Sequence, residues 1–280
     1  MMSFLNPKRW FYTLGKKRFF EFLFLVLFLL FFYGPLLYTF LLAFANKYEF
    51  PNIIPAEFGF KWWGYVLSQP TLVRSIGLSF LFAFATIFVS MIICLPAAYV
   101  LARFNFPGRK AVMFSFLLGN AFPKIGIYTS MAIVFYRINL MGTFTGVLLI
   151  HLIECMMMMI WLPASAFKNV PVQQEEAARD AGAGPLRTFW YITLPNAWPG
   201  IAVAALFAFI GSLGENTGTL LVGLPYYRTM PVEMYGVILD YPSTAGAVFS
   251  LILIAPNLLL LLLFRKYVGG ETLARGYKMG

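Results

Sequence analysis

Six long apolar stretches, separated by polar loops, run through this sequence between residues 22 and 264. The hydrocarbon core of a bilayer requires about 20 predominantly apolar residues per helix, and each stretch approximately meets that requirement. The sequence therefore predicts an all-α polytopic membrane protein with six transmembrane helices in one domain. The predicted spans are Phe22–Ala45, Ile76–Leu101, Ala111–Phe135, Gly142–Phe167, Pro199–Val222 and Ala245–Phe264.

The amino-acid composition argues against the soluble alternatives. Hydrophobic residues make up 60% of the chain and charged residues only 11%, whereas soluble domains carry roughly 25% charged residues. So little charge is not enough to cover a water-exposed surface, which argues against a soluble enzyme and rules out a disordered chain. Cys94 and Cys155 lie inside apolar runs without a CxxC partner, so neither a disulfide framework nor a zinc site is predicted.

The first apolar stretch has some features of a cleavable signal peptide. A basic segment (residues 16–18) precedes it, and residues 43–45 (AFA) resemble a cleavage site. The apolar region of a signal peptide is about 7–15 residues long, and this stretch is far longer. A retained transmembrane helix is therefore favoured over a cleaved signal.

Lysine and arginine are distributed unequally between the two sides of the predicted membrane. With the N-terminus inside, the six spans place 15 of the 21 basic residues on the inner side and 6 on the outer side. The positive-inside rule then predicts that both termini are cytoplasmic. The inner loops also explain the net charge of +10, so no nucleic-acid partner is predicted. The predicted organisation is a cytoplasmic segment (1–21), a transmembrane domain (22–267) and a cytoplasmic tail (268–280).

The longest inner loop, at about residues 168–198, is polar but has the signals of ordered structure. Good helix formers occupy Val172–Ala181, and Pro171 stands where its missing N–H costs nothing. Gly182 is suited to the left-handed conformation that ends a helix. A second short helix is predicted over Leu186–Thr193, ended by residues 194–195 (LP), which would turn the chain into the fifth span. The loop is therefore predicted to be a cytoplasmic helix-turn-helix.

This loop also contains a spaced motif, which consists of Glu176, Ala177, Ala178, Gly182, Ile192, Leu194 and Pro195. The residues and their spacing resemble the EAA loop in permease subunits of ATP-binding-cassette (ABC) importers. The motif lies between the fourth and fifth spans, which is also its place in that family. An ordinary amphipathic loop helix is the alternative reading.

The resemblance extends over most of the chain. The helices after the first span resemble the type I importer permease domain, and residues 268–280 resemble the tail of maltose-type sugar permeases. Residues 101–108 (LARFNFPG) resemble an inner loop of that group, but residues 214–219 (GENTGT) look more like permeases for sulfate, molybdate or ferric iron. The resemblance therefore implies an importer for a carbohydrate or polyol, with a polyamine or inorganic ion as the alternative.

The family resemblance also implies a mechanism and a set of partners. The loop helix would dock on a separate ATPase, and closure of two ATPases on ATP would rock the permease between inward-open and outward-open states. In this reading Glu176 orients the loop by hydrogen bonding, the two alanines allow close approach, and Gly182 makes the turn. The implied partners are a second permease, identical or homologous, two ATPase subunits, an extracytoplasmic solute-binding protein and the lipid of a bacterial plasma (inner) membrane.

No chemistry of its own is predicted for this chain. The sequence has no P-loop motif, so no cofactor is expected in it, and ATP and Mg would be bound by the partner ATPases. A membrane enzyme is the remaining alternative class. It would need a metal-ligand set or a nucleophile beside a base, and the sequence shows neither.

Five polar residues inside the predicted spans are functional candidates, because such residues are costly in lipid. His151 and Glu154 lie three apart on one helix face, either as a proton or cation site of a secondary transporter or, preferably, in a mutual hydrogen bond. Glu215 and Asn216 lie among glycines, where they would line the substrate pathway or mark a structural kink with a gate role. Lys124 would line the same pathway, or lie at a helix break and face a cavity or pair with an acid.

Overall fold

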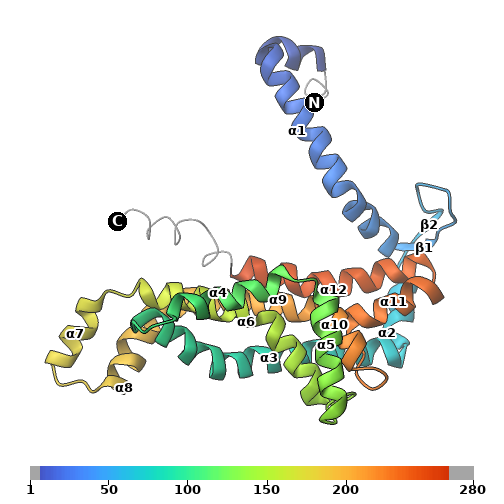
Figure 1. The fold of residues 1–280 in the computed structure, drawn as a ribbon. Coiled ribbons are helices and arrows are strands. Elements are labelled where there is room, and N and C mark those ends of the chain that lie inside the picture. Colours follow the sequence, from blue (N-terminus) through green and yellow to red (C-terminus); the bar gives the residue numbers. More distant parts are fainter. Residues whose placement is uncertain (1–6, 265–280) are drawn as a thin grey trace.

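The computed structural model describes residues 7–264, and helices dominate the described chain (Figure 1). The predicted cytoplasmic tail, and the resemblance carried by residues 268–280, lie outside the described residues. In chain order the elements are α1 (Pro7–Ala43), β1 (Ala45–Lys47), β2 (Glu57–Phe58), α2 (Lys61–Ser68), α3 (Pro70–Arg103), α4 (Arg109–Ala121), α5 (Lys124–Arg137), α6 (Phe144–Lys168), α7 (Val172–Asp180), α8 (Pro185–Thr188), the π-helix η2 (Phe189–Thr193), α9 (Leu194–Gly214), α10 (Thr217–Val222), α11 (Met230–Asp240) and α12 (Ser243–Leu263).

The helical membrane fold agrees with the predicted one. Within the described residues, five helical segments are long and apolar enough to cross a membrane, and the bent pair α4–α5 makes a sixth if it counts as one span. The five are Lys17–Ala43, Pro70–Arg103, Phe144–Lys168, Pro185–Gly214 and Ser243–Leu263. Each of these overlaps one predicted span, and the bent pair replaces the third.

The third span is broken rather than continuous. Helices α4 and α5 meet at a bend of 100°, and Phe122 between them has an extended backbone (ψ 149°). The cause is Pro123, which has no N–H to continue the helix and disfavours the helical conformation of the residue before it. The prediction of one helix over Ala111–Phe135 was therefore wrong, whereas the predicted break beside Lys124 is present.

The fifth span differs from its prediction at both ends. Residues 194–195 (LP) do not end the preceding helix, because α8, η2 and α9 form one continuous helical segment from Pro185 to Gly214. In η2 the N–H of Leu194 bonds to the carbonyl of Phe189, so the turn ahead of Pro195 is widened. At the other end, α9 stops at Gly214 and α10 starts at Thr217, so the kink is a true break.

Helices α3, α6 and α9 pack side by side as the centre of the bundle. Small residues allow the close approach. A Cβ atom added to Gly200 would lie 2.5 Å from the Cβ of Ala166, so α6 and α9 nearly touch at this crossing. Buried Cys94, Cys155 and Ala204 fill one core cluster, and both cysteines are free thiols.

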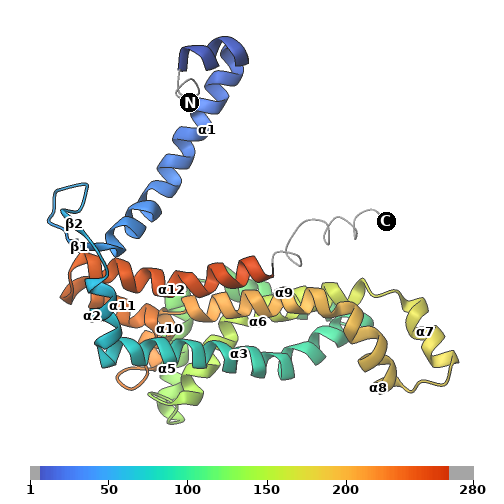
Figure 2. The same ribbon diagram turned by 180° about the vertical axis from the view of Figure 1, so that it is seen from behind.

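The two ends of the bundle are built differently. Figure 2 shows α7 and α8 extending beyond one end, while β1, β2, α2 and α11 lie at the opposite end. At that opposite end β1 and β2 pair antiparallel, and the Trp63 indole N–H donates to the Ala43 carbonyl at 2.8 Å. Helix α1 projects from this end away from the bundle, and its most apolar window has no buried residue.

Candidate functional site

The loop between α6 and α9 has the first helix that the sequence predicts. Helix α7 follows Pro171 and ends near Gly182, whose φ of +88° lies in the left-handed region. The N–H of Gly182 bonds to the carbonyl of Arg179 at 2.8 Å, and the N–H of Ala183 bonds to the carbonyl of Ala178 at 2.9 Å. These bonds satisfy carbonyls at the helix end, which is what a glycine stop allows.

The surface of this loop combines a polar helix α7 with exposed apolar side chains on the segment that follows it. Glu176 and Ala177 are exposed and Ala178 is half-buried. In the following helical segment Leu186 of α8 is 77% exposed and Tyr191 of η2 is 75% exposed. An exposed apolar surface of this kind is typical of a site where another protein binds. The remaining motif residues lie where the chain enters α9, with Ile192 and Leu194 half-buried and Pro195 exposed.

A buried ion pair that the sequence analysis missed holds the loop to the bundle. Arg103, the last residue of α3, donates from Nη2 to Glu175 Oε1 at 2.7 Å and to the Val170 carbonyl at 3.0 Å. Thr193 Oγ1 donates to the same Glu175 oxygen at 2.7 Å. The predicted hydrogen bonding belongs to the neighbouring residue: Glu175 makes these bonds, whereas Glu176 is exposed. Successive side chains are rotated by about 100° along a helix, which separates the two neighbours.

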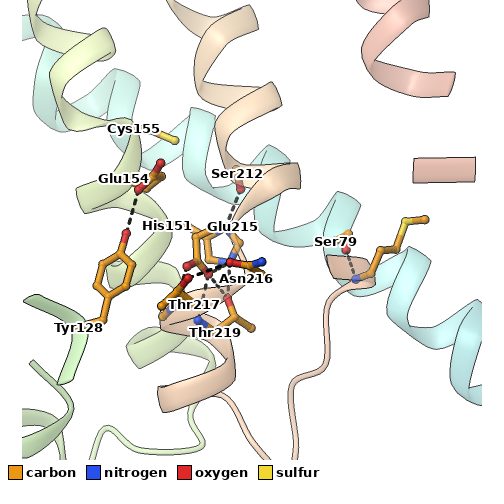
Figure 3. A network of polar contacts seen from close by, with 12 residues as sticks. Ser79, Tyr128, His151, Glu154, Cys155, Ser212, Glu215, Asn216, Thr217 and Thr219 are labelled. Atoms are coloured by element: carbon orange, nitrogen blue, oxygen red, sulfur yellow. Dashed lines mark hydrogen bonds and ion pairs between the residues drawn. The ribbon is translucent and has the colours of Figure 1, made fainter. Parts of the chain in front are cut away.

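A second cluster of polar residues lies inside the bundle, where α6 meets the break between α9 and α10 (Figure 3). His151 is fully buried, and its Nδ1 lies 2.7 Å from Ser212 Oγ. Its Nε2 lies 3.0 Å from Thr219 Oγ1 and 3.9 Å from Glu215 Oε2. Both ring nitrogens are therefore occupied by partners on the fifth span.

Glu215 stabilises the helix break by accepting hydrogen bonds from the start of α10. Its Oε1 accepts from the N–H of Gly218 at 2.7 Å, and its Oε2 accepts from the N–H of Thr219 at 2.9 Å and from the Thr219 hydroxyl. These are N–H groups at the start of α10, which no helical carbonyl can satisfy. Glu215 is only 5% exposed, so it does not face the wet cavity that pathway lining requires. Its geometry corresponds to the structural kink, the other predicted reading.

Asn216 differs from its neighbour Glu215 in exposure. Its side chain is half-buried and donates to the Tyr235 hydroxyl at 3.2 Å. It borders a cavity of about 290 Å³ together with Gly214 and Pro231. A role for Asn216 in the substrate pathway therefore stays a prediction.

Lys124 and Glu154 form an ion pair at the break in the third span. The Tyr128 hydroxyl donates to the other oxygen of Glu154 at 2.9 Å. The predicted His151–Glu154 hydrogen bond was wrong, because the two side chains turn to different neighbours, His151 to α9 and α10 and Glu154 to α5 (Figure 3). The Lys124 side chain is 53% exposed beside a cavity of about 140 Å³ that Ser115 also borders. The predicted pairing with an acid is confirmed, and a pathway role for Lys124 stays a prediction.

Comparison with known proteins places this architecture among transport components. Residues 94–268 match the family described as "Binding-protein-dependent transport system inner membrane component". The diacetylchitobiose uptake system permease protein NgcG of Streptomyces coelicolor is 26% identical over 251 residues, covering 85% of this chain and 82% of that protein.

Two further relatives differ in the solute that their names give. The maltodextrin transport system permease protein MalD of Streptococcus pneumoniae is 30% identical over 195 residues, 68% of this chain and 70% of that protein. The molybdate/tungstate transport system permease protein WtpB of Thermococcus kodakarensis is 28% identical over 208 residues, 74% of this chain and 83% of that protein.

A solved structure has the same fold. It is a chain of a bacterial ABC transporter involved in the import of the acidic polysaccharide alginate. The similarity covers 90% of this chain and 98% of that chain, with a TM-score of 0.69 and 20% sequence identity.

Proposed function

Since this chain belongs to the family of inner membrane components of binding-protein-dependent transport systems, we propose that it forms half of the solute pathway of an ATP-driven importer. It is a multi-pass permease, a transport subunit and not an enzyme. In the proposed assembly it pairs with a second permease and works with two ATPases, which bind ATP and Mg, and with an extracytoplasmic solute-binding protein. No cofactor is proposed for this chain itself.

The observation that carries the proposal is the α7–α8 loop. It extends beyond the end of the bundle, Gly182 of the motif forms the turn after α7, and Glu176, Ala177 and Leu186 are exposed on it. An ATPase that docks on this surface would reach the ends of two spans at once. The proposed orientation therefore has the loop and both termini in the cytoplasm, and β1 and β2 outside.

The proposed solute is a carbohydrate or polyol. Support comes from the sugar permeases among the relatives, one of which matches over 85% of this chain. The similarity to the WtpB protein, together with the GENTGT segment at residues 214–219, favours an inorganic oxyanion as the second candidate. A secondary transporter that uses His151 and Glu154 as one site is not retained, since the two side chains do not meet.

The test is to purify the tagged chain after co-expression with ABC-type ATPases of the same organism, and to reconstitute the complex in vesicles. We expect the ATPase to copurify, and ATP-dependent uptake to be competed by oligosaccharides and not by molybdate. Glu176→Lys should weaken ATPase copurification while leaving the melting temperature of the permease unchanged. Uptake driven by a proton gradient without ATP would contradict the proposal, and competition by molybdate alone would select the second candidate.

A further inference from the structure

Helix α7 makes few packing contacts with the rest of the protein. It extends beyond the end of the bundle (Figure 1), and within the described chain its main packing partners are α8 and η2. Most of its side chains are exposed, and Glu175 is its one buried residue. A force that an outside partner applies to α7 therefore reaches the spans through the backbone on either side of α7 and through a few side-chain contacts, one of which joins Gln174 to Asn196 of α9.

Glu175 makes the buried contacts among these, and it makes them to two different spans. A single oxygen, Oε1, accepts from Arg103 at the end of α3 and from Thr193 at the end of η2, each at 2.7 Å. Helix α3 is the second span, and η2 runs directly into α9, the fifth span. One carboxylate oxygen thus joins α7 to the ends of two central helices of the bundle.

Burial strengthens the contacts that Glu175 makes with Arg103 and Thr193. The side chains of Arg103 and Glu175 are only 12% and 6% exposed, and Thr193 is fully buried. Water cannot readily replace a partner at such a site, so the loss of Arg103 or Glu175 leaves the charge of the other buried and uncompensated. Hydrogen bonds to charged groups are also shorter and roughly twice as strong as neutral ones. Arg103 also holds the Val170 carbonyl just ahead of α7, which fixes the entry to the helix.

We propose that Glu175 is a positioning residue that clamps α7 to α3 and α9, so that movement of the docked helix is transmitted to both spans together. The proposal rests on the proposed function, in which α7 receives the ATPase. The neighbouring glutamates then have separate tasks: Glu176 faces the partner, and Glu175 faces the bundle. Loss of the clamp would uncouple docking from movement without abolishing docking.

The test compares Glu175→Gln and Thr193→Val in the reconstituted complex with the ATPase, using Thr193→Ser and Asp180→Asn as matched controls. Thr193→Val keeps the side-chain shape and removes the hydroxyl, whereas Thr193→Ser keeps the hydroxyl. Asp180 is an exposed carboxylate on the same helix that makes none of these bonds. Three quantities are measured for each variant: copurified ATPase, ATP hydrolysis, and solute transported per ATP hydrolysed.

We expect Glu175→Gln to retain the ATPase and its hydrolysis, with transport per ATP lowered roughly tenfold, as for a lost charged hydrogen bond of about 1.5 kcal/mol. Thr193→Val should lower transport per ATP by a smaller factor, and both controls should keep the native ratio of solute transported to ATP hydrolysed. A native ratio in both Glu175→Gln and Thr193→Val would overturn the clamp, as would loss of folded permease in both. If the native chain retains no ATPase, the proposed function fails instead, which is a separate outcome.

Discussion

Glu175 and Glu215 are the two buried glutamates among the described residues, each 5% exposed, and they are held in opposite ways. Glu215 bonds to N–H groups only three and four residues ahead of it, so it repairs a local break. Glu175 bonds to Arg103, 72 residues away, and so joins separate helices. The comparison indicates that a carboxylate with local partners caps a helix end, whereas one with distant partners joins a loop to the bundle.

The largest expected effect comes from removing Glu215, the glutamate whose partners are local. Glu215→Ala leaves the N–H groups of Gly218 and Thr219 and the Thr219 hydroxyl without their acceptor, at about 1–3 kcal/mol for each unsatisfied buried group. The melting temperature should fall steeply and uptake should fall with the amount of folded protein. Asn216→Ala, at a half-buried position, should change the melting temperature little. Lost uptake at an unchanged melting temperature in Glu215→Ala would show pathway lining instead.

A second test concerns how tightly the intramembrane break is packed. A Cβ atom at Gly218 would lie 2.2 Å from Ile150 Cγ2, whereas one at Gly214 would meet nothing within 4 Å. Gly218→Ala should therefore destabilise the fold by about 1–3 kcal/mol through overpacking, and Gly214→Ala should be nearly neutral. Thermal unfolding in detergent measures both. Equal melting temperatures for the two variants would show that α10 is not held against α6 as described.

The smallest expected effect on stability is at the turn between α7 and α8. Gly182 has a φ of +88° in open space, so Gly182→Val costs about 1–2 kcal/mol of backbone strain and no clash. Gly184 has a φ of −68°, and Gly184→Ala should be tolerated. We expect Gly182→Val to reduce substrate-stimulated ATPase activity of the complex while the bundle melts almost normally. Normal stimulation would count against a role for this turn in docking.

The sequence was informative where a signal is local. Apolar length located the spans, and Gly182 marked the end of α7 because left-handed turns select glycine. Pro123 is a local signal of a different kind, because it has no N–H to continue a helix, and it explains the break beside Lys124 that the continuous third span left out. By contrast, the choice between Glu175 and Glu176 depends on Arg103, far away in the chain, and adjacent residues carry no sign of which one faces inward.

The same limit explains one of the two main errors. His151 and Glu154 are three residues apart on α6, so their side chains point in broadly similar directions. The remaining rotation about the helix axis is enough for His151 to reach α9 and for Glu154 to reach α5. Pro195 signals a helix end, but the π turn of η2 carries the helix past it into α9. The first outcome depends on which helices pack around α6, which spacing along the sequence does not contain. The second depends on a local turn, because Pro195 falls in the first turn of α9, where its missing N–H costs nothing.

The central claim, that the exposed face of α7 is the ATPase docking surface, is tested most directly by labelling Ala177→Cys with a maleimide. The native thiols, Cys94 and Cys155, are buried and should stay unreactive. Ile53→Cys, at a site 77% exposed toward the opposite end, is the matched control. We predict that Ala177→Cys reacts in the isolated chain and is protected in the ATPase complex, whereas Ile53→Cys reacts equally in both. Full labelling of Ala177→Cys with the ATPase bound would contradict the claim.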